Sequence, residues 1–273
     1  MTGDSLRRLK EIPDESVQCC ITSPPYFGLR NYGHDGQIGK ESNISDYVDS
    51  LSGIFKEVIR ILKQDGTLWL NLGDTYLDRG LIGVPWRVAF ALKDQGWMLR
   101  QDIIWHKTDP MPEPTKDRFV RSHEHIFLFA KRGRYFLDAS VVREAAVSLQ
   151  KGKRKFGGVN KYKGVIQDDR HDVGNDYVDP VDGKRNRRDV WSCATANYKG
   201  AHFATYPPKL IEPAVLSATR EGDIILDPFS GAGTTGFVAL SYERKYLGIE
   251  LNPEYNRLAY ERLKAVPRGG KPL

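Results

Sequence analysis

Short apolar runs and segments with helical spacing alternate along most of the chain. Apolar runs that predict buried strands lie at residues 17–21, 67–72, 98–105, 126–130, 223–227 and 246–250. Segments that predict helices lie at residues 45–63, 85–95, 209–218, from the 230s to about 243, and from 253 onward. This alternation predicts an α/β fold with a doubly wound, mostly parallel sheet, which places its chemistry at the carboxyl ends of strands.

The first predicted strand runs into Thr22-Ser23-Pro24-Pro25-Tyr26, here called the proline turn. Each proline fixes its φ angle and lacks an N–H group, so the turn is stiff and poor in donors. The Ser23 hydroxyl and the Pro24 carbonyl are acceptors, and Tyr26 adds a flat ring. Two acceptors beside a ring suit a planar group with an exocyclic NH2, such as cytosine or adenine. A proline-stiffened strand end without a ligand is the alternative interpretation.

A second candidate site follows the predicted strand 223–227, which ends in Asp227. The next residues, Pro228-Phe229-Ser230-Gly231-Ala232-Gly233-Thr234-Thr235-Gly236, are called the glycine loop. Glycines let the backbone approach a ligand closely, and a helix N-terminus offers free N–H groups. Glu250 ends the next predicted strand, about 20 residues after the first glycine, where a carboxylate can accept hydrogen bonds from two ribose hydroxyls.

The glycine loop also satisfies the G-x-G-x-x-G fingerprint of dinucleotide-binding proteins, so a nicotinamide-dependent (NAD) oxidoreductase is an alternative. Only 23 residues follow Glu250, however, which is too few to complete a dinucleotide-binding sheet. The N-terminal strands must complete it instead. We therefore expect the first and last thirds of the chain to lie side by side, with Tyr26 facing Gly231 across a shared cleft.

Composition restricts the protein class only broadly. The 273 residues include 41 Lys and Arg against 35 Asp and Glu, a net charge of +6 that permits a polyanionic partner. Three cysteines lack zinc-site spacing, and two of them, Cys19 and Cys20, fall in a predicted strand as small core residues. No apolar run reaches the roughly 18 residues that span a bilayer. We expect a soluble, cytoplasmic protein with neither a membrane partner nor a bound metal.

The proline turn, the glycine loop and Gly248-Ile249-Glu250, in this order, resemble the β class of DNA amino-methyltransferases. That class has the catalytic motif first, a target-recognition segment next and the S-adenosyl-L-methionine motif last. The resemblance implies a Rossmann-like methyltransferase fold with circularly permuted motif order and double-stranded DNA as substrate. It also implies direct methyl transfer to a flipped base without a metal, by a monomer or homodimer.

The resemblance assigns residues to two sets. The implied catalytic residues are Ser23, Pro24, Pro25 and Tyr26. The implied S-adenosyl-L-methionine contacts are Asp4, Phe203, Thr205, Asp227, Pro228, Phe229, Gly231, Gly233, Thr234, Thr235 and Glu250. Among these, Asp4 resembles the family's contact to the cofactor adenine, and residues 202–207 resemble the segment that closes over the methionine end.

The identity of Ser23 favours cytosine N4 as the target. Adenine-modifying members usually carry Asp or Asn at this position, and cytosine-N4 members usually carry Ser. A hydroxyl and a carboxylate can each accept from an amino group, so adenine N6 remains the alternative. Two further alternatives are a DNA-binding module with vestigial cofactor binding and a protein-glutamine or RNA amino-methyltransferase. The latter enzymes usually place the glycine loop before the Pro-Pro-Tyr turn.

Residues 145–189 have no helix or strand period and resemble nothing specific in the family. We predict that they form a basic, irregular target-recognition insertion between a catalytic half (1–144) and a cofactor-binding half (190–273) of one domain. The candidate DNA contacts are Lys151, Lys153, Arg154, Lys155, Lys161, Lys163, Arg185, Arg187 and Arg188. Acidic residues at 168–182 argue against a simple phosphate-binding patch, and a solvated surface is the alternative.

Overall fold

The computed structural model describes residues 1–30, 33–34, 36–145, 183–195 and 206–266. The chain divides into two compact units, one formed by Met1–Asp138 with Asp189–Leu273 and the other by Ala139–Arg188. The described part of the second unit consists of a short 3-10 helix, η1 (Ala139–Val142), and an antiparallel pair, β7 (Glu144–Ala145) with β8 (Lys184–Arg185). Everything that follows on the sheet and the site concerns the first unit.

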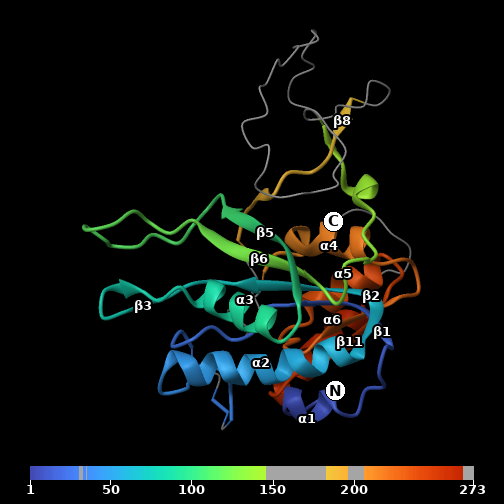
Figure 1. Cartoon of the computed structure of the whole chain (residues 1–273), viewed down its shortest axis with the longest axis horizontal. Helices are drawn as coiled ribbons and strands as arrows, with labels where there is room; N and C mark the ends of the chain where they lie inside the picture. Colours follow the sequence, from blue (N-terminus) through green and yellow to red (C-terminus); the bar gives the residue numbers. More distant parts are fainter. Residues whose placement is uncertain (31–32, 35, 146–182, 196–205, 267–273) are drawn as a thin grey trace, which may run out of the picture. The chain divides into compact units, whose positions relative to one another are not determined.

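A seven-stranded sheet with the order β11-β10-β1-β2-β6-β5-β9 forms the centre of the first unit (Figure 1). Its strands are β1 (Val17–Thr22), β2 (Leu62–Leu72), β5 (Met98–Lys107), β6 (His123–Ala130), β9 (Val190–Cys193), β10 (Ile224–Asp227) and β11 (Lys245–Gly248). Only β6 runs antiparallel to its neighbours β2 and β5; the remaining pairs are parallel. The predicted mostly parallel α/β fold is confirmed.

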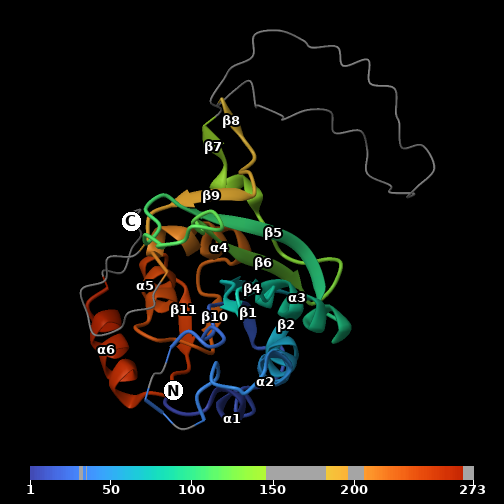
Figure 2. The ribbon, with the colours of Figure 1, turned by 90° about the vertical axis from the view of Figure 1, so that its left-hand side faces the viewer.

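Helices cover both faces of the sheet, as a doubly wound fold requires (Figure 2). One face packs against α1 (Ser5–Leu9), α2 (Ile44–Ile61) and α3 (Val84–Asp94). The other face packs against α4 (Pro208–Ala218) and α5 (Thr234–Ser241), and α6 (Pro253–Lys264) lies against α5. Because successive side chains of β1 point to opposite faces, Cys20 joins the first core and Cys19 the second. Both cysteines are buried and free, as predicted, and burial raises the pKa of Cys19 to about 12.

The first and last thirds of the chain meet in the middle of the sheet. β1 pairs in parallel with β10, with Cys19 opposite Ile225 and Cys20 opposite Leu226. The carboxyl ends of these two strands are therefore neighbours. This confirms the prediction that the first and last thirds of the chain lie side by side. The proline turn follows one strand and the glycine loop follows the other.

The remaining differences from the sequence predictions lie at element ends and in short strands. The last predicted strand, 246–250, is observed as Lys245–Gly248, and the helix predicted to reach residue 63 ends at Ile61 because β2 begins directly afterwards. The hairpin of β3 (Tyr76–Leu77) and β4 (Gly80–Leu81) was not predicted, since two-residue strands carry no period. The four-residue edge strand β9 was also not predicted. None of the described helices is long and apolar enough to cross a membrane.

Candidate active site

The proline turn leaves the sheet directly at the end of β1. The Tyr47 hydroxyl, on α2, donates a hydrogen bond of 2.8 Å to the Pro25 carbonyl and so fixes the second proline. Within the described residues, nothing donates to the Pro24 carbonyl, which therefore stays available as an acceptor. Both features agree with the stiff, acceptor-rich turn expected from the sequence.

Tyr26 is held on several sides. Its hydroxyl donates to Glu124 Oε2 at 2.6 Å and lies 3.3 Å from Ser23 Oγ. A Cβ atom added to Gly73, the first residue after β2, would lie 2.7 Å from the Tyr26 ring, so only glycine allows this close approach. Burial, with the Glu124 carboxylate as the second cause, raises the pKa of Tyr26 well above its ordinary value. The phenol therefore keeps its proton at neutral pH.

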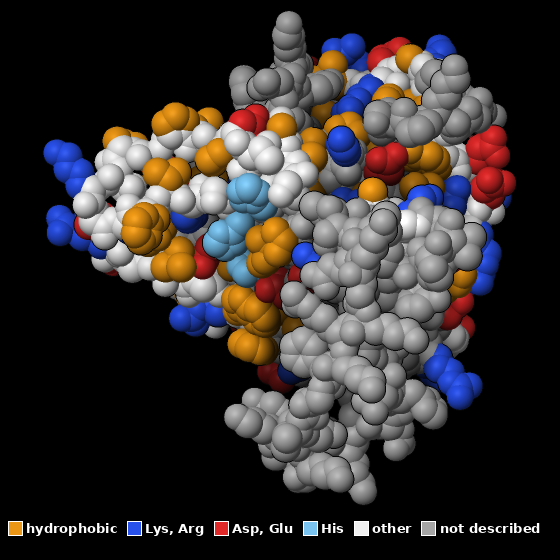
Figure 3. All heavy atoms as spheres, turned by 90° about the horizontal axis from the view of Figure 1, so that it is seen from above, with side chains coloured by type: hydrophobic (Ala, Val, Ile, Leu, Met, Phe, Trp, Pro, Cys, Tyr) orange, Lys and Arg blue, Asp and Glu red, His pale blue; other side chains and the backbone are white. Residues whose placement is uncertain are grey.

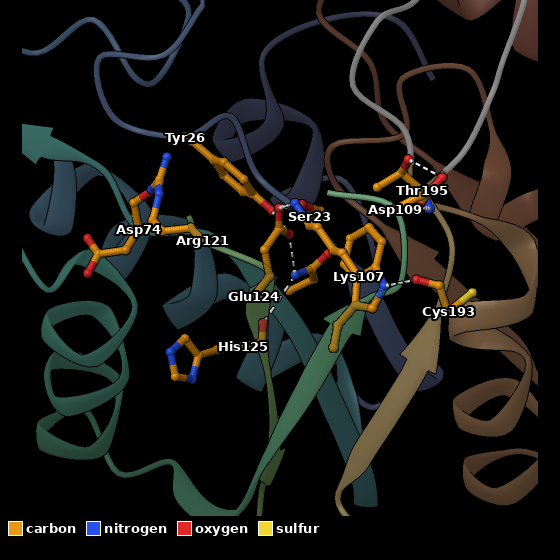
Figure 4. A network of polar contacts seen from close by, with 12 residues as sticks. Ser23, Tyr26, Asp74, Lys107, Asp109, Arg121, Glu124, His125, Cys193 and Thr195 are labelled. Carbon is orange, nitrogen blue, oxygen red and sulfur yellow. Dashed lines mark hydrogen bonds and ion pairs between the residues drawn. The ribbon is translucent and has the colours of Figure 1, made fainter. Parts of the chain in front are cut away.

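Figure 4 shows Tyr26, Glu124 and Lys107 converging from three separate parts of the chain, beside Ser23. Lys107 Nζ donates to Glu124 Oε1 at 2.5 Å, and Asn71 Nδ2 donates to Glu124 Oε2 at 3.0 Å. The sequence analysis did not single out Lys107, Glu124 or Asn71. Lys107 and Glu124 lie just outside the predicted strands 98–105 and 126–130, and Asn71 lies inside the predicted apolar strand 67–72. The charged residues at the ends of two apolar strands were the available signal.

The histidines near this network have structural partners. His106 faces His123 across β5 and β6, and the rings of His123 and His125 are 5.5 Å apart. His125 Nδ1 also lies 3.0 Å from Asp102 Oδ1, and His106 Nδ1 lies 3.1 Å from Ser192 Oγ. Figure 3 shows histidine side chains together on one face, with exposed hydrophobic side chains beside them. These contacts give His106 partners on β6 and β9.

The glycine loop turns sharply between β10 and α5. Gly231 has φ +50° and Gly233 has φ +74°, a left-handed conformation that favours glycine. A Cβ atom on Gly236 would lie 2.5 Å from the Tyr246 ring, so this glycine lets α5 pack closely on β11. Glu250 closes the other side, where Oε2 accepts from Gly231 N at 2.8 Å and Oε1 from Asn252 N at 2.9 Å. Burial raises the pKa of Glu250.

Asp227 connects the glycine loop to the proline turn. Its Oδ1 accepts from Thr22 Oγ1, the last residue of β1, at 2.6 Å and from Phe229 N at 3.1 Å. Its Oδ2 accepts from Thr235 Oγ1 at 2.5 Å. Burial raises the pKa of Asp227 to about 6, although these hydrogen bonds act in the opposite direction. The structure thus joins the two predicted sites through one buried carboxylate.

The N-terminal segment lies along the glycine loop. Gly3 N donates to the Glu250 carbonyl at 2.9 Å, and Ser5 Oγ donates to the Pro228 carbonyl at 2.6 Å. Asp4 therefore follows directly on a residue bonded to Glu250, and its contact with the cofactor adenine stays a prediction. One Asp4 oxygen is already used, because it caps α1 by accepting from Arg7 N at 2.8 Å.

The other predicted residues divide between described and undescribed parts of the chain. Thr234 is buried at the start of α5, and Phe229 packs against the first core. Phe203 and Thr205 lie outside the described residues, although the neighbouring Tyr206 hydroxyl bonds Thr235 Oγ1. Of the predicted DNA contacts, Lys151, Lys153, Arg154, Lys155, Lys161 and Lys163 also lie outside the described residues. Arg185, Arg187 and Arg188 lie in the second unit, where Arg185 pairs with Glu144 at 3.0 Å. Their roles stay predictions.

The arrangement of the two motifs agrees with the comparison to known proteins. Residues 17–261 match the DNA methylase family N6_N4_Mtase. The chain belongs to this family. It is 43% identical over 291 residues to the type II methyltransferase M.XycI of Xanthomonas campestris pv. cyanopsidis, covering 96% of this chain and 86% of the relative.

Two solved structures share the fold. The PvuII DNA methyltransferase (cytosine-N4-specific) matches with a TM-score of 0.71 and 23% identity, over 96% of this chain and 84% of that one. The Thermus thermophilus protein TTHA0409, in complex with S-adenosyl-L-methionine, matches with a TM-score of 0.64 and 26% identity, over 97% and 95%. This chain is thus a DNA methyltransferase of the N4/N6 amino-methyltransferase family that uses S-adenosyl-L-methionine. Family membership also decides against the oxidoreductase interpretation.

The glycine loop fits this cofactor. Glu250 accepts backbone hydrogen bonds from Gly231 N and Asn252 N, and a carboxylate has about four acceptor positions, so it keeps capacity for a ribose hydroxyl. The left-handed glycines keep side chains away from the space in front of α5. When bound, S-adenosyl-L-methionine supplies an electrophilic methyl group on a good leaving group. Among the described residues there is no cluster of three or more His, Cys, Asp or Glu that could hold a metal.

Proposed function

We propose that the protein transfers a methyl group from S-adenosyl-L-methionine to N4 of a cytosine flipped out of double-stranded DNA. The observation that carries this proposal is the hydrogen bonding of the proline turn. Ser23 Oγ and the Pro24 carbonyl present acceptors at the carboxyl end of β1, and Asp227 ties that strand end to the glycine loop at 2.6 Å. A base held by the turn and a cofactor held by the loop would therefore share one edge of the sheet.

In this proposal the proline turn aligns the target base and makes the lone pair of its amino nitrogen available. A base in duplex DNA must leave the helix to be reached, at a cost of a few kcal/mol. Stacking on the Tyr26 ring recovers part of this cost, since base–aromatic stacking contributes roughly 1–3 kcal/mol. Hydrogen bonds from the amino group to Ser23 and the Pro24 carbonyl turn the nitrogen lone pair out of conjugation and toward the methyl group. Correct alignment supplies much of the rate.

The preference for cytosine rests on Ser23. Cytosine-N4 enzymes usually carry Ser at this position, and adenine enzymes usually carry Asp or Asn. The PvuII enzyme, whose name states cytosine-N4 specificity, shares the fold but not enough sequence to carry the target base across. Mass spectrometry of nucleosides, after DNA is incubated with the protein and S-adenosyl-L-methionine, tests the proposal. We expect N4-methylcytosine. N6-methyladenine instead would overturn the assignment of the base, and no methylated nucleoside would overturn the proposal as a whole.

We further propose that the basic residues of 145–189 contact DNA and determine the recognised sequence. Phosphate contacts of this kind weaken steeply with salt, whereas base contacts change specificity. Arg187→Ala and Arg188→Ala should therefore reduce DNA affinity and its salt dependence. We further propose that the protein acts in the cytoplasm as a monomer or homodimer. Type II relatives such as M.XycI support a role in restriction and modification.

A further inference from the structure

The hydrogen bonds around Tyr26 run in one direction. An ionised carboxylate has no proton to give, so in the 2.6 Å contact between the Tyr26 hydroxyl and Glu124 Oε2 the tyrosine must donate. That bond uses the only proton of the phenol. In the 3.3 Å contact with Ser23 Oγ, Tyr26 must therefore accept and Ser23 must donate. Both hydroxyl protons point toward Glu124, and the lone pairs of Ser23 remain for a ligand.

Glu124 is built to fix this direction. Lys107 Nζ, from the end of β5, donates to its Oε1 at 2.5 Å, and Asn71 Nδ2, from β2, donates to its Oε2 at 3.0 Å. The side chains of Glu124 and Lys107 are only 12% and 22% exposed, so water competes little for these contacts. Among the described residues, the donors to this carboxylate are thus an ammonium, an amide and the hydroxyl of Tyr26.

We propose that Glu124 is a positioning residue of the methyl transfer, which directs the hydroxyls of Tyr26 and Ser23 and accepts through them the proton that the target amine releases. The proposal rests on the proposed function, because it needs an amino group at Ser23. It has a second consequence for the base. With its own proton directed inward, Ser23 can only accept from the ligand, so it admits the NH2 group of cytosine and disfavours the carbonyl oxygen of thymine.

The atoms balance without a further reactant. The amino nitrogen forms its bond to the methyl carbon with its lone pair, the bond from that carbon to sulfur breaks, and sulfur keeps the electron pair. The nitrogen then carries two protons and a positive charge. One proton passes to Ser23 Oγ as the serine proton passes to Tyr26 and the tyrosine proton passes to Glu124. The products are a neutral methylated amine, a neutral thioether and a neutral Glu124, which later loses its proton to water.

Two substitutions separate this role from simple packing. Tyr26→Phe keeps the ring that stacks on the base but removes the hydroxyl that connects Ser23 to Glu124. Glu124→Gln keeps the shape of the side chain but cannot take a proton, and its amide can donate to Tyr26 and reverse the chain. We expect each variant to lose about 100-fold or more in the single-turnover rate of DNA methylation, the usual contribution of proton transfer. The dissociation constants for S-adenosyl-L-methionine and for DNA should stay unchanged.

The double variant gives the sharper readout. Because both residues act in one chain, Tyr26→Phe combined with Glu124→Gln should lose no more than the worse single variant. Glu113→Gln is the matched control, since Glu113 pairs with Arg118 and Arg121 outside the network and should change the rate by no more than about threefold. Thermal unfolding and cofactor titration identify any variant that fails to fold.

The outcomes distinguish this inference from the function on which it rests. If the unaltered protein methylates no base, the proposed function fails. If it methylates DNA and either Tyr26→Phe or Glu124→Gln keeps the full single-turnover rate, the proton path is refuted while the function stands. Losses that multiply in the double variant would also refute it, because independent effects do not describe one chain of hydrogen bonds.

Discussion

The proline turn and the glycine loop occupy equivalent places on neighbouring parallel strands, yet their backbones are chemically opposite. Prolines at 24 and 25 remove two N–H groups and leave carbonyl and hydroxyl oxygens. Glycines at 231 and 233 take left-handed angles and lead directly into the N-terminus of α5, which presents N–H groups. One strand end is therefore a set of acceptors suited to an amino group, and the other is suited to an anionic or hydroxyl-rich ligand.

Asp227 makes these two regions interdependent. Its two oxygens accept from Thr22, at the end of β1, and from Thr235, on α5. A buried carboxylate that accepts several hydrogen bonds fixes the positions of its donors, so Asp227 joins the turn to the loop in addition to the pairing of β1 with β10. The comparison leads to a clear expectation: changes in the turn should affect turnover, and changes in the loop should affect cofactor binding.

The largest expected effect separates the two regions directly. Ser23→Ala or Tyr26→Ala should lower the turnover of DNA methylation by about 10³-fold, since the amino group loses an acceptor or its stacking surface. Isothermal titration should find the dissociation constant for S-adenosyl-L-methionine unchanged, because neither residue belongs to the glycine loop. A collapse of cofactor affinity in these variants would show that the division of roles is wrong.

The next prediction concerns the glycine loop, where a substitution at Glu250 should affect cofactor binding. A hydrogen bond to a charged group contributes roughly 1.5–3 kcal/mol, so Glu250→Ala, which removes the proposed acceptor for two ribose hydroxyls, should weaken S-adenosyl-L-methionine binding by about 100-fold or more. Asp227→Ala should act in the same direction. Titration with the cofactor measures both. Unchanged affinity in Glu250→Ala would exclude this carboxylate from the cofactor site.

The motifs that lie close in sequence were predictable, and the contacts between strands were not. Ser23 to Tyr26 and Asp227 to Glu250 are each contiguous or linked by one strand–loop–helix unit, so composition and spacing locate them. The side-by-side placement of the first and last thirds was also predicted, whereas the pairing of β1 with β10 is a finding of the structure. These steps use only local backbone preferences and the size of a sheet.

Glu124 shows why the rest could not be predicted. Its contacts with Lys107 and Asn71 depend on the antiparallel placement of β6 between β2 and β5, with Trp105 opposite Glu124 and Asn71 opposite Ile126. A shift of one residue in this register would turn Glu124 toward the other face of the sheet. Nothing in the sequence specifies this register, because a connection of some 15 residues separates β5 from β6.

The raised pKa of Asp227 makes its contribution to folding stability depend on pH. Because the folded-state pKa is about 6, against an ordinary value of 3.8, the native state holds this proton more tightly than the unfolded state. The contribution of this carboxyl to stability is complete below about pH 4 and is lost as pH rises through about 6, a difference of about 2 to 3 kcal/mol. Asp227→Asn should lack this loss.

Urea unfolding between pH 4 and pH 8 measures the effect as the difference between the two proteins. The difference should move in favour of Asp227→Asn as pH rises and then level off above about pH 7. Glu250, whose pKa is also raised by burial, titrates in both proteins and largely cancels. Parallel stability curves would mean that burial does not disfavour the ionised form of Asp227. The role assigned to this carboxylate between the proline turn and the glycine loop would then be contradicted.

The smallest expected effect concerns the hydrogen bond between Thr22 and Asp227. Thr22→Val keeps the shape of the last side chain of β1 but removes the donor 2.6 Å from Asp227. Above about pH 6, where Asp227 is ionised, the free energy of unfolding should fall by about 1 to 2 kcal/mol, because a buried carboxylate loses one hydrogen bond. Thr22→Ser, which retains the hydroxyl, should lose much less. The difference should become smaller at pH 4 and below, where the folded carboxyl is neutral and accepts more weakly than a carboxylate. A loss of equal size at every pH would assign the role of Thr22 to packing in the strand rather than to its hydrogen bond with ionised Asp227.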